Sequence, residues 1–182
     1  MKEINLTDIK VLYKAEEIKS KVMDIATKLN ELYKNEEVCV ICVLKGAVIF
    51  ATDLIRELNM PVNIEFIRLS SYGNATESSG KVNAVDIKLP DLNNKNIVIV
   101  EDIVDTGLTA RFLLDFLKSN FNVKSIKFVS LLNKKIFRRT EIEPDYYGFD
   151  IDDKFVVGYG LDYNGLYRNL KYIGYVDKSI LM

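Results

Sequence analysis

The hydrophobic and polar positions of this chain follow two alternating patterns. Uniformly apolar runs, which are typical of strands buried on both faces, occupy Val38 to Leu44 and Ile97 to Val100. Other segments carry apolar residues at helical spacing, which predicts amphipathic helices. The predicted helices are Ala15 to Tyr33, Ala47 to Leu58 and Leu108 to Leu117, and the further strands are Val62 to Leu69, Lys124 to Leu132, Tyr146 to Phe149, Phe155 to Gly158 and Tyr172 to Val176.

This alternation predicts an α/β fold in which a twisted parallel sheet carries helices on both faces. The 182 residues show no internal repeat and no linker, so we expect a single domain with irregular additions from both termini. In such sheets the ligand binds beyond the carboxyl ends of the strands. The residues that directly follow each strand are therefore the first candidates for a functional site.

The segment from Ser70 to Pro90 follows neither pattern. Gly, Ser, Asn and Thr are dense at its start, and no hydrophobic period is sustained along it. A loop of this length in a compact domain is usually functional or mobile. We interpret residues 70–90 as a lid, and the alternative is a surface loop without a catalytic part.

Charge and composition exclude several classes of protein. The chain has 25 basic and 26 acidic residues, a balance that gives no reason to expect nucleic-acid or membrane binding. It contains no apolar run of about eighteen residues, and its N-terminus alternates charged with apolar residues, unlike a secretory signal. We therefore expect a cytoplasmic protein. Histidine is absent, which excludes His-based acid–base catalysis and His-ligated zinc.

The two cysteines, Cys39 and Cys42, form a CxxC inside an apolar run that predicts a buried strand. Residues three apart on a strand point to opposite faces, so the two sulfurs are poorly placed to share a metal or to form a disulfide. We predict two thiols packed in the core, which fits a reducing compartment.

The stretch from Ile97 to Thr109, IVIVEDIVDTGLT, carries the candidate chemistry. Glu101 and Asp102 follow its strand and are acceptors suited to a vicinal diol, directly or through a divalent cation. Asp105 to Thr109 form a short loop that opens a helix, where backbone N–H groups favour an anion such as phosphate. Asp105 can act as a general base toward a substrate nitrogen. The alternative is that the acids only solvate the strand end while Thr106 caps the helix.

Val100 to Thr109 resembles the phosphoribosyl-pyrophosphate motif of type I phosphoribosyltransferases. Further segments appear in the order found in the hypoxanthine-guanine phosphoribosyltransferases, and the resemblance covers nearly the whole chain from about residue 10. These segments are Val43 to Gly46, Ser71-Tyr72, Ser130 to Leu132 with Lys134, and Asp153 to Tyr159 continuing through Leu161 to Asn164 and on to Arg168. One departure is Leu108, where some members carry lysine. Because backbone N–H groups supply most of that site, we expect a modest effect on affinity.

The resemblance implies an enzyme of purine salvage. Such an enzyme transfers the 5-phosphoribosyl group from 5-phosphoribosyl 1-pyrophosphate to hypoxanthine or guanine, giving IMP or GMP and pyrophosphate, with Mg²⁺ as cofactor. It also implies a core at about residues 36–145 and a small hood from about 1–12 and 146–182. As partners it implies these small-molecule substrates and self-association to a homodimer or homotetramer.

Carried onto this sequence, the resemblance assigns one set of residues to 5-phosphoribosyl 1-pyrophosphate. Glu101 and Asp102 hold the ribose hydroxyls, and with Asp162 they are the candidate magnesium ligands. The pyrophosphate contacts include a non-proline cis peptide, a kind of bond retained mainly at functional sites. The 5-phosphate is cradled by Asp105, Thr106, Gly107, Leu108 and Thr109, and pyrophosphate is met by Lys45, Gly46 and Arg168.

A second set is assigned to the purine. Asp105 takes or shares the proton of purine nitrogen 7, and Lys134 donates to the oxo group. Phe155 stacks on the ring, and the Val156 carbonyl accepts from a ring N–H. Asp162 is counted with the purine-binding residues and also anchors a magnesium ion bound to pyrophosphate. The active end of the lid is Ser71 with Tyr72.

Two of these residues have plain alternatives. Lys134 belongs to a basic group with Lys135, Arg138 and Arg139 that, taken alone, predicts a solvated face. Phe155 could equally be a core aromatic.

Two rival functions remain open at this stage. One is an RNA-binding, nucleotide-sensing regulator of the same fold, which needs a basic face that only Lys134 to Arg139 could supply. DNA-binding regulators of this type carry an additional N-terminal domain, which we do not expect here. The other is a phosphoribosyltransferase for another base, such as xanthine-guanine or a pyrimidine. Lys134 with Lys154-Phe155-Val156 favours a 6-oxopurine, but the preference among hypoxanthine, guanine and xanthine stays open.

Overall fold

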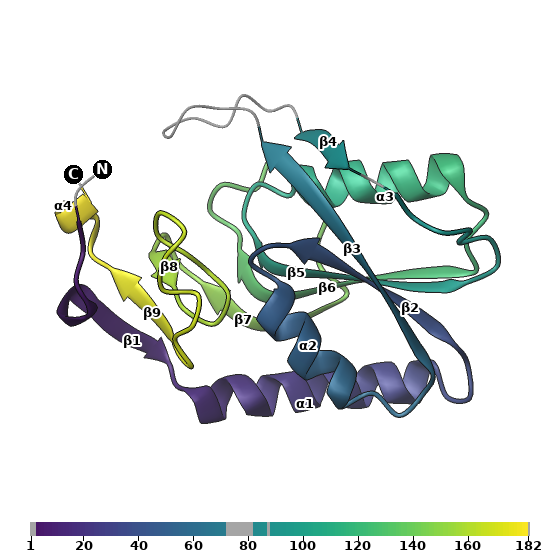
Figure 1. Ribbon diagram of the computed structural model, residues 1–182, viewed down its shortest axis with the longest axis horizontal. Coiled ribbons are helices and arrows are strands. Elements are labelled where there is room, and N and C mark those ends of the chain that lie inside the picture. Colours follow the sequence, from purple (N-terminus) through teal and green to yellow (C-terminus); the bar gives the residue numbers. More distant parts are fainter. Residues whose placement is uncertain (1–2, 72–81, 87, 182) are drawn as a thin grey trace.

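The computed structural model describes residues 3–71, 82–86 and 88–181, which form two sheets and their helices (Figure 1). In chain order the elements are a 3₁₀ turn (Leu6–Asp8), β1 (Ile9–Tyr13), α1 (Ala15–Leu32), β2 (Val38–Leu44), α2 (Val48–Arg56), β3 (Val62–Ser71), β4 (Val82–Asp86), β5 (Asn96–Val104), α3 (Leu108–Asn120), β6 (Ser125–Lys134), β7 (Tyr146–Ile151), β8 (Phe155–Val157), β9 (Ile173–Val176) and α4 (Lys178–Leu181).

The larger sheet has the strand order β4-β3-β2-β5-β6-β7. Strands β3, β2, β5, β6 and β7 are all parallel, and β4 pairs antiparallel with β3 at the edge. The predicted parallel α/β sheet is therefore confirmed. Because the parallel strands run in one direction, the residues that follow β2, β5 and β6 meet along one edge.

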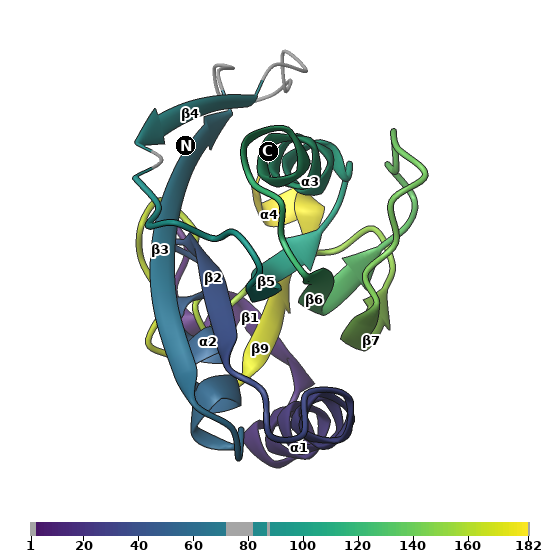
Figure 2. The same ribbon diagram turned by 90° about the vertical axis from the view of Figure 1, so that its right-hand side faces the viewer.

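Helices cover both faces of this sheet, as predicted: α1 and α2 lie on one face and α3 on the other (Figure 2). The apolar run of β2 supplies both cores in alternation. Val40 and Cys42 pack with α1 and α2, whereas Cys39 and Ile41 pack with α3. Each residue of the strand thus buries its side chain on one face or the other, which explains why the run is uniformly apolar.

The smaller sheet has the order β1-β9-β8 and is antiparallel. It joins the two ends of the chain, because Ile9 of β1 pairs with Val176 of β9. Figure 1 shows it beside the larger sheet, on the side to which the arrowheads of β2 and β3 point. We refer to this sheet and the loop of residues 158–172 as the hood. It covers the sheet edge at which the candidate residues lie.

Four strands differ from the sequence expectation. Residues 9–13, expected as part of an irregular N-terminal addition, form β1 and pair with β9. Strand β7, which we placed in the hood, is the last strand of the larger sheet. Residues 82–86, expected within an irregular loop, form β4 and pair with the end of β3. Strand β5 does not end at Val100 but continues to Val104, so Glu101 and Asp102 lie within it. Each difference arises from pairing with a distant strand, which local periodicity does not reveal. The division into core, hood and lid otherwise stays a prediction.

None of the helices that the structure describes is long and apolar enough to cross a membrane.

Both cysteines are unpaired and buried, on opposite faces of β2, which confirms the core-packing interpretation of the CxxC. Burial raises the pKa of Cys39 to about 11 and that of Cys42 to about 12. Since the thiolate is the reactive form, we predict that neither thiol of the native protein reacts with an aromatic disulfide reagent at about pH 8. Both should react after denaturation in urea. Rapid modification of either native thiol would contradict this packing.

Candidate active site

The acidic pair lies where β5 separates from one of its neighbours. Pairing with β2 stops at Cys42 opposite Val100, whereas pairing with β6 continues to Val104 opposite Asn133. Residues 101–104 therefore have a sheet neighbour on one side only. Glu101 is buried, with 4% of its surface exposed, and Asp102 is partly buried. The acids sit at the edge of a gap in the sheet rather than on an open strand end.

Glycines allow two loops to close on this gap. A Cβ on Gly46 would lie 1.6 Å from Oδ2 of Asp102, so a larger residue would collide with the carboxylate. Gly160, at φ +101°, approaches the same loop from the hood, and a Cβ there would lie 2.0 Å from the Gly46 carbonyl oxygen. The peptide bond between Leu44 and Lys45 is cis. The loop after β2, the acidic pair and the hood are thus in direct contact.

Arg168 and Asp162 complete this half of the site from the hood. Nη2 of Arg168 pairs with Oδ1 of Asp162 at 2.5 Å, and Nη1 donates to the Gly160 carbonyl at 2.5 Å. Oδ2 of Asp162 accepts from the Gly165 N–H at 2.7 Å. Both side chains act electrostatically on Asp102. The structure therefore brings together Gly46, Asp102, Asp162 and Arg168, as the sequence predicts, while Lys45 is exposed beside them.

Burial shapes the electrostatics of the acidic pair. It raises the pKa of Glu101 to about 8, and the charge of Asp102 adds to the effect. Burial also raises the pKa of Asp102 to about 6, opposed by the Ile103 N–H, which donates to Oδ1 at 3.0 Å. Two adjacent acids with raised pKa values, one buried and one partly buried, form a place where a cation or hydroxyl donors would be stabilised.

The donor set fits a magnesium ion held jointly by protein and substrate. Within residues 3–71, 82–86 and 88–181, no three Cys, Asp or Glu side chains group closely enough to hold a metal by themselves. Mg²⁺ commonly takes only one or two carboxylates and completes its shell with water and substrate phosphates. Glu101, Asp102 and Asp162 offer that kind of set around the gap.

The predicted phosphate loop, residues 105–109, has the expected form. It leads into α3, a helix of 13 residues whose N-cap residue Gly107 makes no side-chain cap, and a helix start of this kind favours an anion. The Leu108 N–H donates to Oγ1 of Thr106 at 3.4 Å, so the alternative in which Thr106 caps the helix describes part of this turn. Gly107 stands at φ +78°, and a Cβ there would lie 2.2 Å from Oγ1 of Thr140. The Arg139 N–H donates to the Thr106 carbonyl at 2.9 Å. The turn after β6 thus packs directly against the loop.

Lys134 and Asp105 lie together at the carboxyl ends of β6 and β5. Lys134 is 8% exposed, and its Nζ lies 3.2 Å from Oδ1 of Asp153 and 3.8 Å from Oδ2 of Asp105. The interpretation of the basic group as a solvated face is therefore wrong for Lys134. Oδ1 of Asp105 is buried and accepts no hydrogen bond. Buried carboxylate oxygens nearly always accept a hydrogen bond. This oxygen can therefore accept one from a donor on a ligand.

The hood supplies the remaining purine candidates. Val156 pairs with Tyr175 of β9, and the half-buried Phe155 packs edge-on against Tyr163, with ring centroids 5.7 Å apart. Phe155 also packs against the small core of the hood, so the core-aromatic alternative describes part of its environment. Of the lid residues, Ser71 ends β3, and Tyr72 lies outside the described residues.

Sequence reasoning missed three polar residues that gather around the end of β6: Asn133 in the strand, Arg138 in the turn after it and Asp153 after β7. Asp153 pairs with Lys134, Oδ1 of Asn133 accepts from Arg138, and Arg138 also donates to the Asp105 carbonyl just past β5. Asn133 carried a usable signal, because a polar residue in an otherwise apolar strand needs a buried partner. No sequence signal pointed to Arg138, because it lies in a run of basic residues that predicts an exposed turn.

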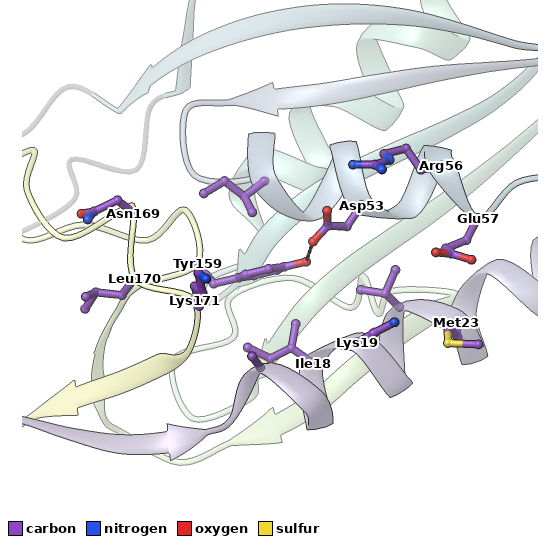
Figure 3. Close-up of a pocket in the computed structure, with 13 residues that line it drawn as sticks. Ile18, Lys19, Met23, Asp53, Arg56, Glu57, Tyr159, Asn169, Leu170 and Lys171 are labelled. Atoms are coloured by element: carbon purple, nitrogen blue, oxygen red, sulfur yellow. Dashed lines mark hydrogen bonds between the residues drawn. The ribbon is translucent and has the colours of Figure 1, made fainter.

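A cavity of about 430 Å³ lies elsewhere, between α1, α2 and the hood loop (Figure 3). None of the predicted site residues lines it. Figure 3 shows the Tyr159 hydroxyl pointing to Asp53 of α2, to which it donates at 2.6 Å. This bond ties the hood loop to the helix that follows Lys45 and Gly46, so the cavity borders the site without belonging to it.

Known proteins resemble this chain over almost its whole length. The family described as the phosphoribosyl transferase domain matches residues 8–164. The hypoxanthine-guanine phosphoribosyltransferase of Bacillus subtilis is 42% identical over 171 residues, which is 94% of either chain. The crystal structure of a hypoxanthine phosphoribosyltransferase from Staphylococcus aureus superposes with a TM-score of 0.91 at 36% identity, over 99% of this chain and 100% of that one. A hypoxanthine-guanine phosphoribosyltransferase from Bacillus anthracis gives a TM-score of 0.87 at 41% identity, over 96% and 100%.

The raised pKa of Glu101 predicts a pH-dependent stability. The native carboxyl holds its proton up to about pH 8, whereas the unfolded one releases it near 4.5. The native state therefore binds more protons between these values, and the stability contributed by Glu101 is fully present below about pH 4.5 and is lost as pH rises from there through about 8. Glu101→Gln, which cannot ionise, should match the parent near about pH 5 and exceed its unfolding free energy by about 1–3 kcal/mol near about pH 9.

Urea denaturation without Mg²⁺ or substrate measures this difference. Glu31→Gln, at an exposed position of α1, is the matched control and should show no pH-dependent gain. An equal stability difference for Glu101→Gln at both pH values would show that Glu101 is not held protonated by burial.

Proposed function

We propose, on the premise that this chain belongs to the phosphoribosyltransferase family, that Asp105 and Lys134 activate the purine while the loop after β2 and the hood receive the leaving group. Within the family the chain belongs to the hypoxanthine-guanine phosphoribosyltransferases. It is an enzyme of purine salvage that transfers the 5-phosphoribosyl group from 5-phosphoribosyl 1-pyrophosphate to hypoxanthine or guanine. The assignment of roles to residues is our proposal.

The observation that carries the proposal is the buried, unpartnered Oδ1 of Asp105 beside Lys134. An acceptor and a cationic donor, side by side, match the edge of a 6-oxopurine that presents the N7–H and the oxo group. Asp105 accepts the N7 proton while Lys134 donates to the oxo oxygen. Loss of that proton makes the ring a better nucleophile, and general-base help of this kind contributes typically about 10²–10⁴ in rate.

Bond making and breaking then balance without a further reactant. The bond from the anomeric carbon to pyrophosphate breaks, and its electron pair leaves with pyrophosphate. The purine N9 supplies the pair for the new bond, and the N7 proton passes to Asp105. Arg168, with Lys45 and the Gly46 backbone, stabilises the departing negative charge. In the structure Arg168 is already held beside Asp162, at the gap where that charge would develop.

Magnesium belongs to the proposal as cofactor. Glu101 and Asp102 would hold it through the ribose hydroxyls, and Asp162 would hold it on the pyrophosphate side. Bound there, it supplies positive charge that offsets the pyrophosphate and the two acids.

The other assignments follow from the family resemblance. Residues 105–109 bind the 5-phosphate at the start of α3, Phe155 stacks on the purine, and the Val156 carbonyl accepts from its ring N–H. The core, the hood and a lid at residues 70–90, with Ser71 and Tyr72 at its active end, close the site against water, which would otherwise capture the cationic sugar. We further propose a cytoplasmic homodimer or homotetramer.

No described contact favours the RNA-binding alternative. Lys134 and Arg138 are turned inward, and the exposed Lys135 pairs with Asp150 at 3.3 Å. A xanthine-guanine preference differs only in which 2-substituent the hood accepts, and a side-by-side assay of the three purines decides it.

The purified protein with Mg²⁺ and 5-phosphoribosyl 1-pyrophosphate should convert hypoxanthine to IMP and guanine to GMP.

Asp105→Asn should keep the KM for 5-phosphoribosyl 1-pyrophosphate within a few fold and lower kcat by about 10²–10⁴, because it removes only the proton acceptor. Asp115→Asn, on the exposed side of α3, is the control and should behave as the parent. No turnover of either purine would overturn the function, and a fully active Asp105→Asn would overturn the base.

Removal of divalent cations by a chelator should abolish turnover, and added Mg²⁺ should restore it. Asp102→Asn should raise the Mg²⁺ concentration needed for half-maximal rate by about tenfold, since one of the few carboxylates at the site is lost. Activity that survives the chelator unchanged would show that the acids bind the ribose without a metal.

A further inference from the structure

Arg138 lies in the turn after β6, in the basic group that the sequence presents as a solvated face. Its side chain is nevertheless only 9% exposed. A guanidinium carries five N–H donors in a rigid fork and stays charged in proteins. Burying it is costly unless those donors find acceptors. The groups that accept hydrogen bonds from Arg138 therefore indicate its role.

The inner part of the fork joins the ends of two strands. Nε donates to the Asp105 carbonyl, just past β5, at 3.1 Å. Nη2 donates to Oδ1 of Asn133 on β6 at 2.6 Å, with the Val104 and Lys134 carbonyls at 3.4 and 3.5 Å. One planar group thus contacts the backbone of both proposed purine-activating residues.

The outer part of the fork is anchored on the turn itself. Nη1 donates to the Ile142 carbonyl and pairs with Oε1 of Glu143 at 2.9 Å. Nδ2 of Asn133 donates to the same Glu143 carboxylate at 3.3 Å and to Asp150 of β7 at 3.1 Å. Because Glu143 is half exposed, the charge of Arg138 is balanced from the solvent side, while its inner contacts are neutral.

From these contacts we infer that Arg138 is a positioning residue of the reaction, which holds Asp105 and Lys134 at the separation that a 6-oxopurine requires. The inference rests on the proposed roles of those two residues. Their charged ends lie 3.8 Å apart but come from different strands, and the Arg138 guanidinium bonds to the backbone of both. Arg138 acts only through them. A misplacement of about 1 Å at a reacting group can lower a rate by about 10²-fold.

A lysine cannot take this role, because its single ammonium reaches one strand or the other but does not span both with fixed geometry. Arg138→Lys keeps the charge and the chance of a pair with Glu143. It should lower kcat by about 10–100-fold, with a smaller change in the KM for hypoxanthine. Arg139→Lys is the matched control, since the Arg139 side chain is exposed and only its backbone N–H contacts the loop. It should leave kcat unchanged.

A double-mutant cycle separates positioning from mere support of the fold. If Arg138 acts by placing Asp105, Arg138→Lys should lower kcat by less than about threefold in the Asp105→Asn background, because the group it places is already gone. Folding of each variant is checked by its thermal transition. Should Arg138→Lys not fold, Asn133→Ala removes the shortest inner contact and replaces it in the same cycle.

The possible outcomes are distinct. A coupled, non-additive cycle supports the inference. Equal losses in both backgrounds, or a kcat unchanged by Arg138→Lys, overturn it and leave the proposed function standing if Asp105→Asn is impaired. Full activity of Asp105→Asn alone overturns the proposed base, and the inference with it.

Discussion

The site depends on one feature of strand pairing: β5 leaves β2 after Val100 but stays paired with β6 through Val104. This separation opens a gap in an otherwise continuous parallel sheet. Gly46 and Gly160 enter from one side, where neither tolerates a Cβ. Asp105 and Lys134 follow from the strands that remain paired. The two halves of the proposed reaction, departure of pyrophosphate and activation of the purine, would thus lie on either side of one strand end.

Contacts from the surrounding structure stabilise the gap, whereas the acidic side chains inside it destabilise the folded protein. Glu101 is buried and Asp102 partly buried, both with raised pKa values, and Asp105 keeps an unpartnered carboxylate oxygen. Such groups destabilise a folded chain until a ligand supplies cations and donors. The surrounding structure tolerates them because the two sheet cores, the hood and the turn after β6 hold the backbone in place. The protein is therefore built to bind a substrate rich in phosphate, hydroxyl and N–H groups.

Most of the fold and much of the site could be predicted from the sequence. Some features could not, and particular residues show why. Lys45, Asp102, Asp105 and Lys134 were found because each follows or ends a strand that apolar runs reveal. The burial of Arg138 could not be predicted, because a basic turn predicts solvent-exposed side chains. Only the tertiary structure shows the backbone carbonyls to which Arg138 donates. The length of β5 was hidden for a similar reason, since its last residues are strand only through pairing with β6.

By itself the sequence determined most of the strands and helices, though not β1 or β4, that the main sheet is parallel, and which residue types stand at the carboxyl ends of its strands. Those properties are local, because hydrophobic periodicity and helix-start chemistry act over a few residues. The tertiary structure alone decided which ends meet, that β1 and β9 close the hood, and that a buried arginine joins β5 to β6. These depend on contacts between residues far apart in the chain, whose pairing a single sequence does not encode in any local pattern.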